Sequence, residues 1–565
     1  MHKCTQVRKL RGIRAGHRRL GVNVATLCFA LFAATYLPAQ TIPQPPQGEG
    51  SELDGPTEFV MSLGETEISL NPISSYTASE AQVYTALFEG LVTYHPLTLE
   101  PIPGVARTWT VSNDGRRWTF QLREDARYDN GDPVIAQHFR DTWLALLDPE
   151  AESAYSFLFD VIEGAEEYRR GRNTDPDSVG IRPISGTELV VELNSPATHF
   201  LDILCHHSFV ALHPEMVSYG DDVMPDQVVS NGPYTLVSAD ENELVMEQNE
   251  QYWDASEVSI PNLRIRTVDD PETITEAFNR GSVQWLAGGW NLDAVETRSH
   301  IVVNPLFATS YFFFRADEEP WQDDNVRRAM ALLLPWVEIR SDEIYFTPAQ
   351  ALVPTIPFYE NPDGIVEQNR DEALRLLSEA GYPRGEGLPD VTVTIPGGED
   401  NIRITDLFAS AWEEELGIEV VVTTVPYPRY FDALEGDNYT LGTISWIGDF
   451  ADPLTFLQMW TSGSNLNDSG YSNAEFDELI TQSLSQRGTT RFATLAAAEA
   501  LLLDTAVVLP IAHSPAVNVI DTQRISGWHP NPLNVHPFKH LAFAALAPIP
   551  RVADRPLRLL RRSGL

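Results

Sequence analysis

Residues 86–143 read ALFEGLVTYHPLTLEPIPGVARTWTVSNDGRRWTFQLREDARYDNGDPVIAQHFRDTW. Near the middle of this segment, Trp118, Phe120 and Leu122 alternate with polar neighbours, directly after the turn sequence SNDG. Alternation of this kind places the apolar side chains on one face of an extended chain. Residues 117–124 are therefore predicted to form a half-buried β-strand, and the later segments ELVVELN and ELVMEQN have the same pattern.

Segments with a helical period follow further along the chain. In RDEALRLLSEAGYP, residues 370–383, the apolar residues fall on one helical face, and Gly381 and Pro383 are stop signals. The segments FDELITQSL and RFATLAAAEALLLDTA also predict helices, whereas VVLPIAHSPAVNVI predicts a strand. Because no low-complexity break interrupts residues 58–543, we expect an α/β or α+β chain without an obvious division into independent modules.

The first 40 residues differ from the rest. Seven basic residues come before or at the start of the apolar run LGVNVATLCFALFAATYL, which ends before Pro38, Ala39 and Gln40. This pattern predicts a secretory signal at 1–40 that is cleaved after Ala39 or Gln40. An uncleaved membrane anchor is the alternative, because the run is close to the shortest that spans a bilayer. Residues 41–57 are rich in Pro and Gly and are expected to form a flexible leader, and 546–565 a basic tail.

Charge and cysteine content limit the possible functions. The chain has 80 acidic residues and a formal net charge of −41. Loss of the signal leaves 32 basic residues and a charge of about −48, so nucleic acid and anionic membranes are not expected as partners. Only Cys205 then remains, and the exported protein therefore has no intramolecular disulfide.

Motifs of catalysis and cofactor binding are not found in the sequence. No glycine-rich loop has the spacing of a nucleotide site, and no serine lies in a nucleophile elbow. The segment CHHSF, with Cys205, His206 and His207, is the most metal-like cluster. Neighbouring side chains on a strand point to opposite faces and seldom share one ion, so no metal or other cofactor is expected. A large exported chain of this kind points to binding, with a secreted hydrolase as the alternative.

Residues 441–460, LGTISWIGDFADPLTFLQMW, pass from an apolar strand to two carboxylates. Asp452 is explained by the Pro that follows it, because Asp-Pro is a good opening for a helix that begins at Leu454. Asp449 has no such explanation. A carboxylate at the end of an apolar strand, beside Trp446, is a candidate receptor for a cationic ligand in an aromatic cavity.

These segments together resemble one family. Residues 86–143 are followed, in order, by SNGPYTLVS, MEQNEQYWD, YFFFRADEEPWQDDNVRRAMALLL and YSNAEFDELI. The whole, over about residues 58–543, is similar to the extracytoplasmic solute-binding proteins of peptide ABC importers, especially the oligopeptide- and dipeptide-binding proteins. The resemblance implies a monomer that binds peptides between two closing lobes and delivers them to a membrane permease.

The family's fold would be α/β and periplasmic-binding-protein-like (type II), with two lobes, hinge strands and an extra inserted domain. Carried onto this chain, the resemblance places the first lobe at 58–100, 226–308 and 512–545. The extra domain would lie at 101–225 and the second lobe at 309–511.

The resemblance also implies a binding site. Asp449 would form an ion pair with the α-ammonium group of the ligand, and Ser445, Trp446 and Ile447 would offer backbone groups to an extended peptide. Ala78 would face them through its backbone. Tyr155 matches a position near the N-terminal end of the ligand, although an ordinary packed tyrosine is the alternative.

The sequence departs from the peptide binders at the ligand's other end. Where they often have Arg before the Trp, this chain has Thr443, and no Lys of the matching segment is expected to take the ligand's carboxylate. An Arg that the sequence does not place would hold that end, or nothing would. The same clamp around an oligosaccharide or a metal chelate is the alternative, and Asp449 favours a peptide.

Overall fold

The computed structural model describes residues 57–64, 66–75, 77–197, 199–220, 223–267, 270–341, 347–426, 429–436 and 438–544. The expected signal sequence, the basic tail at 546–565 and the leader up to residue 56 lie outside these ranges. Among the described residues, no helix is both long and apolar enough to cross a membrane.

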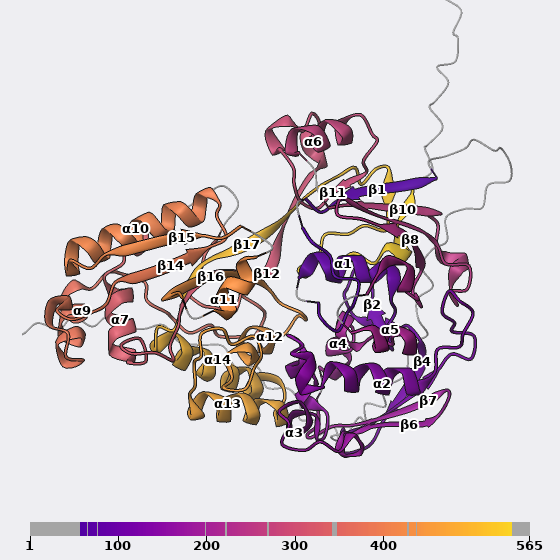
Figure 1. Ribbon diagram of the computed structural model, residues 1–565, viewed down its shortest axis with the longest axis horizontal. Helices are drawn as coiled ribbons and strands as arrows, with labels where there is room; N and C mark the ends of the chain where they lie inside the picture. Colours follow the sequence, from indigo (N-terminus) through magenta and orange to yellow (C-terminus); the bar gives the residue numbers. More distant parts are fainter. Residues whose placement is uncertain are drawn as a thin grey trace, which may run out of the picture. The chain divides into compact units, whose positions relative to one another are not determined.

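The largest sheet has 11 strands and joins segments from most of the chain (Figure 1). Its strands, in spatial order, are β15 (Val420–Thr424), β14 (Val391–Ile395), β16 (Leu441–Ile447), β12 (Ile301–Phe314), β17 (Val508–Ile520), β11 (Trp285–Leu286), β1 (Glu58–Ser62), β10 (Asn262–Arg266), β9 (Glu243–Gln248) and β8 (Tyr234–Ala239). The short strand β13 (Thr347–Pro348) pairs with β17 outside this order.

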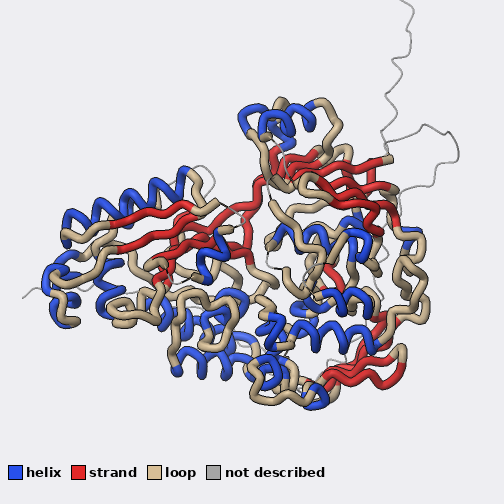
Figure 2. The backbone as a smooth tube through the Cα atoms, viewed as in Figure 1, coloured by secondary structure: helices blue, strands red, loops and turns tan. Residues whose placement is uncertain are grey.

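The long strands β12 and β17 lie between two groups of strands in this sheet (Figure 2). The first group is β15, β14 and β16, and the second is β11, β1, β10, β9 and β8. They are antiparallel, and their register runs from Ile301 opposite Val519 to Phe313 opposite Val508. The lobe boundaries expected from the sequence, at 308/309 and 511/512, both fall inside these two strands. The strands thus have the positions that hinge strands would need, and the lobe ranges stay a prediction.

A second, antiparallel sheet lies within residues 101–225. It has the order β4 (Ala106–Val111), β5 (Arg117–Leu122), β7 (Glu188–Glu192) and β6 (Ile181–Ser185). Trp118, Phe120 and Leu122 of β5 are buried, because the alternation of the sequence gives that strand one apolar face. The strands predicted at 117–124, ELVVELN and ELVMEQN are therefore confirmed as β5, β7 and β9.

The predicted helices are also present. They are α9 (Arg370–Glu379), α13 (Ala474–Ser485) and α14 (Gly488–Asp504). Helix α9 buries Ala373, Leu376 and Leu377 on one face, as its period predicts. The segment VVLPIAHSPAVNVI forms β17, again as predicted.

A buried polar cluster connects the segments ALFEGL and NEQYWD, which are far apart in the sequence. The Glu89 carboxylate accepts hydrogen bonds from the Tyr252 hydroxyl and, at 2.6 Å, from Nε1 of Trp253. The guanidinium of Arg123 lies 3.4 Å from the centre of the Trp253 ring. Glu89 is only 6% exposed, and its hydrogen bonds offset part of the cost of burying a carboxylate. The cluster ties two distant segments of the chain together.

Candidate ligand-binding cavity

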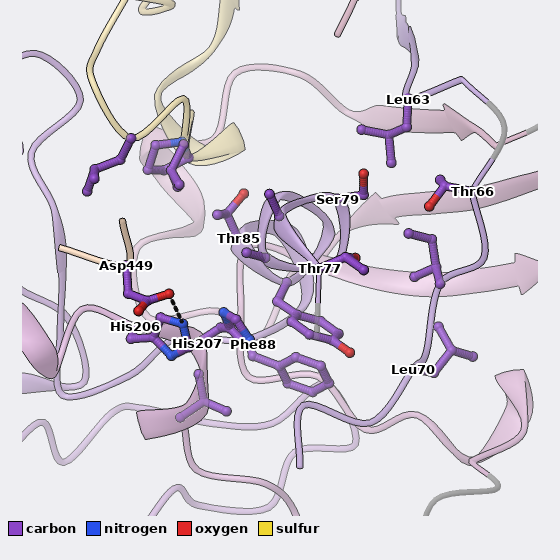
Figure 3. A pocket seen from close by; sticks show the side chains of 18 of the residues that line it. Leu63, Thr66, Leu70, Thr77, Ser79, Thr85, Phe88, His206, His207 and Asp449 are labelled. Carbon is purple, nitrogen blue, oxygen red and sulfur yellow. Dashed lines mark ion pairs between the residues drawn. The ribbon is translucent and has the colours of Figure 1, made fainter. Parts of the chain in front are cut away.

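A cavity of about 1020 Å³ lies between segments that are far apart in the sequence. This is at the upper end of the range of about 300–1,000 Å³ for small-ligand sites. All six candidate residues from the sequence line it: Ala78, Tyr155, Ser445, Trp446, Ile447 and Asp449. Figure 3 shows part of the cavity wall, including Asp449, His206, His207 and Phe88. The structure therefore brings the predicted site residues together around one space.

One edge of strand β16 has no neighbouring strand beyond its first residue. On one side it pairs with β12 along its whole length, from Leu441 opposite Phe314 to Ile447 opposite Ala308. On the other side it pairs with β14 only at Leu441, opposite Val393. Past that point, β16 has no strand partner on this edge among the described residues.

The direction of the backbone groups follows from the alternation of a strand. The Gly448 N–H donates to the Phe307 carbonyl at 2.8 Å, so the backbone groups of residue 448 point towards β12. Backbone groups two residues apart point the same way, and neighbours point oppositely. The N–H and C=O groups of Ser445 and Ile447 therefore point to the free edge, where an extended chain can pair with them.

Tyr430 ends this free edge. Its hydroxyl accepts the N–H of Thr443 at 2.9 Å and donates to the carbonyls of Thr443 at 2.8 Å and Thr394 at 3.1 Å. The side chain is fully buried at the start of α11 (Tyr430–Glu435), in the fork where β14 and β16 separate. Because the Thr443 backbone is already bonded to Tyr430, the open backbone groups of this edge begin at Ser445.

Asp449 lies beyond the other end of β16, where its side chain is 5% exposed. The carboxylate oxygen Oδ2 accepts a hydrogen bond from the Thr455 hydroxyl at 2.9 Å, and the Asp449 N–H donates to the same hydroxyl oxygen at 2.8 Å. The Tyr94 hydroxyl donates to the Asp449 carbonyl at 3.0 Å. Burial raises the pKa of Asp449 to about 7, since few groups compensate its negative charge.

Asp452 has the capping role predicted for it. Its Oδ1 accepts the N–H of Leu454 at 3.0 Å, where α12 (Leu454–Leu457) begins. The same carboxylate forms a bidentate pair with Arg491, at 2.6 and 2.8 Å. The Arg491 guanidinium holds the pKa of Asp452 below its usual value in spite of burial. Of the two carboxylates, only Asp449 is left without a guanidinium or ammonium partner among the described residues.

His206 faces Asp449 across the cavity wall (Figure 3). Its Nε2 lies 3.6 Å from Oδ1 of Asp449, and its Nδ1 accepts the N–H of Ser208 at 3.3 Å. A neutral ring with Nδ1 as acceptor carries its proton on Nε2, towards the carboxylate. Burial, with His207 as a second cause, lowers the pKa of His206 well below its usual value. His206 thus turns its Nε2 edge towards Asp449, at a distance longer than a hydrogen bond.

The remaining candidate residues also have definite surroundings. Tyr155 is 5% exposed, and its ring stands edge-on to His206 with 4.5 Å between ring centres. Trp446 is 6% exposed, and its Nε1–H has no hydrogen-bond partner among the described residues. Ala78 is the first residue of α1 (Ala78–Leu87), a helix capped by Thr77.

Sequence reasoning treated His206 only as a possible metal ligand and did not single out Tyr430. No group of three or more metal-binding side chains is placed to hold an ion in the part of the chain that the structure describes. Lys539 lines the cavity, and the expectation that no lysine takes the ligand's carboxylate stays a prediction. No arginine is among the described residues that line it.

Comparison with known proteins identifies the class. Residues 100–468 match the family model described as bacterial extracellular solute-binding proteins, family 5 Middle. The chain belongs to this family, as the sequence segments predicted. The family consists of solute-binding proteins, which confirms the prediction of a binding protein and not a secreted hydrolase.

Several relatives match over most of their length. The oligopeptide-binding protein OppA of Bacillus subtilis is 27% identical over 489 residues, which covers 82% of this chain and 89% of that protein. The periplasmic murein peptide-binding protein MppA of Escherichia coli is 27% identical over 507 residues, or 86% of this chain and 93% of the relative.

The solved structures confirm the predicted fold class, a type II α/β binding protein. The murein tripeptide binding protein MppA of Escherichia coli has a TM-score of 0.78 at 26% identity and covers 86% of this chain and 98% of its own. Haemophilus influenzae OppA in complex with RPPGFSPFR has a TM-score of 0.78 at 24% identity, with 87% and 100% covered.

Proposed function

We propose that this chain is the extracytoplasmic substrate-binding component of an ABC importer and that it binds peptides between two closing lobes. The observation that carries this proposal is the free edge of β16, which leads from Ser445 to the buried carboxylate of Asp449. A backbone edge that ends at an anion matches an extended peptide that begins with an ammonium group. The relatives named as oligopeptide- and murein peptide-binding proteins support the same ligand class.

The ligand would run antiparallel to β16. With its ammonium at Asp449, the peptide extends towards Thr443 and pairs with the backbone groups of Ile447 and then Ser445. Such pairing reads the backbone and ignores the side chains, which point into the cavity instead. Ala78 and Trp446 also line the cavity and would contact the ligand.

Transport would follow from differential binding to two conformations. A ligand that touches both walls of the cavity binds the closed form more tightly than the open form and shifts the population towards it. The permease of the importer would then recognise the closed monomer, with β12 and β17 as hinges. The N-terminal signal sequence at 1–40 would direct export, and neither a nucleic acid nor a cofactor takes part.

A direct binding measurement tests this function. We expect isothermal titration calorimetry to show that the mature protein binds trialanine, and that N-acetyl-trialanine binds at least tenfold more weakly because it lacks the ammonium. Native mass spectrometry of the purified protein should show short peptides carried through purification. Binding of an oligosaccharide or a metal chelate, without binding of any peptide, would reject the proposal.

A further inference from the structure

We propose that the cavity offers no cation to the C-terminal carboxylate of its ligand and therefore selects peptides with basic side chains. This inference rests on the proposed function and adds the charge class of the ligand. Its central observation is the state of Lys539, which carries the one ammonium group among the described residues that line the cavity.

Lys539 is already paired on two sides. Its Nζ lies 2.5 Å from Oδ2 of Asp254, and its side chain is only 11% exposed. The ammonium also lies 4.5 Å from the centre of the Trp253 ring, beside the carboxylate of Glu89 that Trp253 holds. Burial raises the pKa of Glu89, and the Lys539 ammonium offsets part of that rise. A ligand carboxylate that took Lys539 would have to break this pair and leave buried anions behind.

The histidines of the cavity do not replace it. Burial lowers the pKa of His207 to about 3 and that of His540 to about 4, and it places that of His206 well below the usual value. All three rings are therefore neutral at the pH of most habitats. They can donate single hydrogen bonds to a ligand but carry no positive charge to balance a carboxylate.

Arginine is also absent from the described cavity wall. Where a peptide binder of this family would often have an arginine, the backbone of Thr443 is bonded to Tyr430, and its hydroxyl donates to the Tyr311 carbonyl at 3.0 Å. The short segments between residues 57 and 544 that the structure leaves undescribed contain neither Lys nor Arg. No cation from the body of the chain is therefore left for the far end of the ligand.

The charged side chains that line the cavity are mostly carboxylates. Besides Asp449 and Glu89, the exposed side chains of Glu67, Asp240 and Glu241 line the cavity. A lysine or arginine side chain of the ligand meets favourable charges there, and a glutamate meets repulsion. Since the effect acts through solvent-exposed groups, it weakens when salt screens the charges.

The test uses two tripeptides, Ala-Lys-Ala and Ala-Glu-Ala, each as the free acid and as the C-terminal amide. Calorimetry is performed at pH 8, where Asp449 is ionised, in low salt and in 0.5 M salt. We expect the lysine peptides to bind at least tenfold more tightly in low salt, with a smaller difference in high salt. Each amide should bind at least as tightly as its acid. A free acid that binds tenfold more tightly than its amide would overturn the inference.

Two sets of variants locate the effect. The triple change Glu67→Gln, Asp240→Asn and Glu241→Gln should reduce the preference for lysine several-fold. A matched triple change outside the cavity lining, Glu276→Gln, Glu296→Gln and Glu386→Gln, has the same net charge and should keep the preference.

Lys539→Met should leave the ratio of acid to amide affinities unchanged, whereas a marked loss of acid binding would show that Lys539 holds the carboxylate after all.

A third peptide, trialanine amide, separates this inference from the proposed function. Trialanine amide carries the ammonium and the peptide backbone without further charge. If it binds while lysine and glutamate peptides bind equally, the peptide function stands and the charge selection is rejected. If no peptide binds in any form, both the proposed function and this inference are rejected.

Discussion

The imidazole Nε2 of His206 lies 3.6 Å from Oδ1 of Asp449, across 243 positions of sequence. The ring presents an N–H group to a carboxylate whose second oxygen is held by Thr455. Asp449 is thus oriented from two sides and keeps most of its negative charge uncompensated. This arrangement supports the proposed role of Asp449 as receptor for an ammonium group, because the carboxylate has a fixed direction and few competing partners.

Replacement of the carboxylate tests the receptor directly. Asp449→Asn should reduce the affinity for trialanine by at least 30-fold, because loss of one partner of a buried charge pair costs about 2–5 kcal/mol. The affinity for N-acetyl-trialanine should change little, which makes that peptide the control. Equal losses for both peptides would assign Asp449 a structural role, and titration calorimetry with a thermal unfolding scan distinguishes the two results.

The affinity for peptides should rise with pH through neutrality. The pKa of Asp449 is about 7 in the free protein, because burial favours its protonated form. An ammonium ligand binds the ionised form, so below pH 7 the affinity should fall by up to about tenfold per pH unit as binding has to release a proton. Calorimetry in buffers of different ionisation enthalpy at pH 6 measures that release. Asp449→Asn should abolish the pH dependence, and a profile that is flat from pH 6 to 8 in the unmodified protein contradicts the assignment.

The hydroxyl of Tyr430 should contribute measurably to stability. Tyr430→Phe leaves the buried N–H of Thr443 without its partner and removes a donor from two carbonyls, so we expect the free energy of unfolding to fall by about 1–3 kcal/mol. Tyr382→Phe is the control, since that partly exposed hydroxyl has no hydrogen-bond partner among the described residues. Urea unfolding followed by tryptophan fluorescence measures both, and equal small effects would show that the fork does not depend on Tyr430.

The buried pair of Asp452 and Arg491 should behave as a unit. Arg491→Met removes the guanidinium and leaves a buried carboxylate, and we expect a loss of about 3–5 kcal/mol in the free energy of unfolding. The double variant Arg491→Met with Asp452→Asn removes the stranded charge as well. It should recover a large part of the loss in a urea titration; additive losses would mean that the two side chains stabilise the fold independently.

Much of the fold follows from local pattern. The strand around Trp118 and Phe120 is predictable because only one of its faces is buried. Apolar and polar residues therefore alternate along its sequence. The start of α12 is predictable because Asp452 and Pro453 act on the next residues of the same chain. The site residues from Ser445 to Asp449 come from the family resemblance; the structure places them around one cavity, and their binding role stays a prediction.

The groups that sequence reasoning missed all act over long distances. His206 is important because it lies next to Asp449, and Tyr430 because it bonds two strands where they separate. Neither contact produces a periodic pattern in the sequence around the residue. Lys539 lies on the cavity wall, yet its ammonium group forms an ion pair with Asp254. Its position alone therefore does not reveal whether the ammonium is available, since that depends on a partner 285 positions earlier in the chain.

The open edge of β16 has a consequence for how the protein behaves in a crowded medium. Exposed strand edges are templates for aggregation, because they pair with any extended chain. Here the open edge is only a few residues long, since Tyr430 closes it at Thr443 and the chain turns into α12 after Asp449. The residues of this edge from Ser445 to Asp449 also line the cavity. An edge this short offers few backbone groups to the strand of another copy, which limits its use as a template for aggregation.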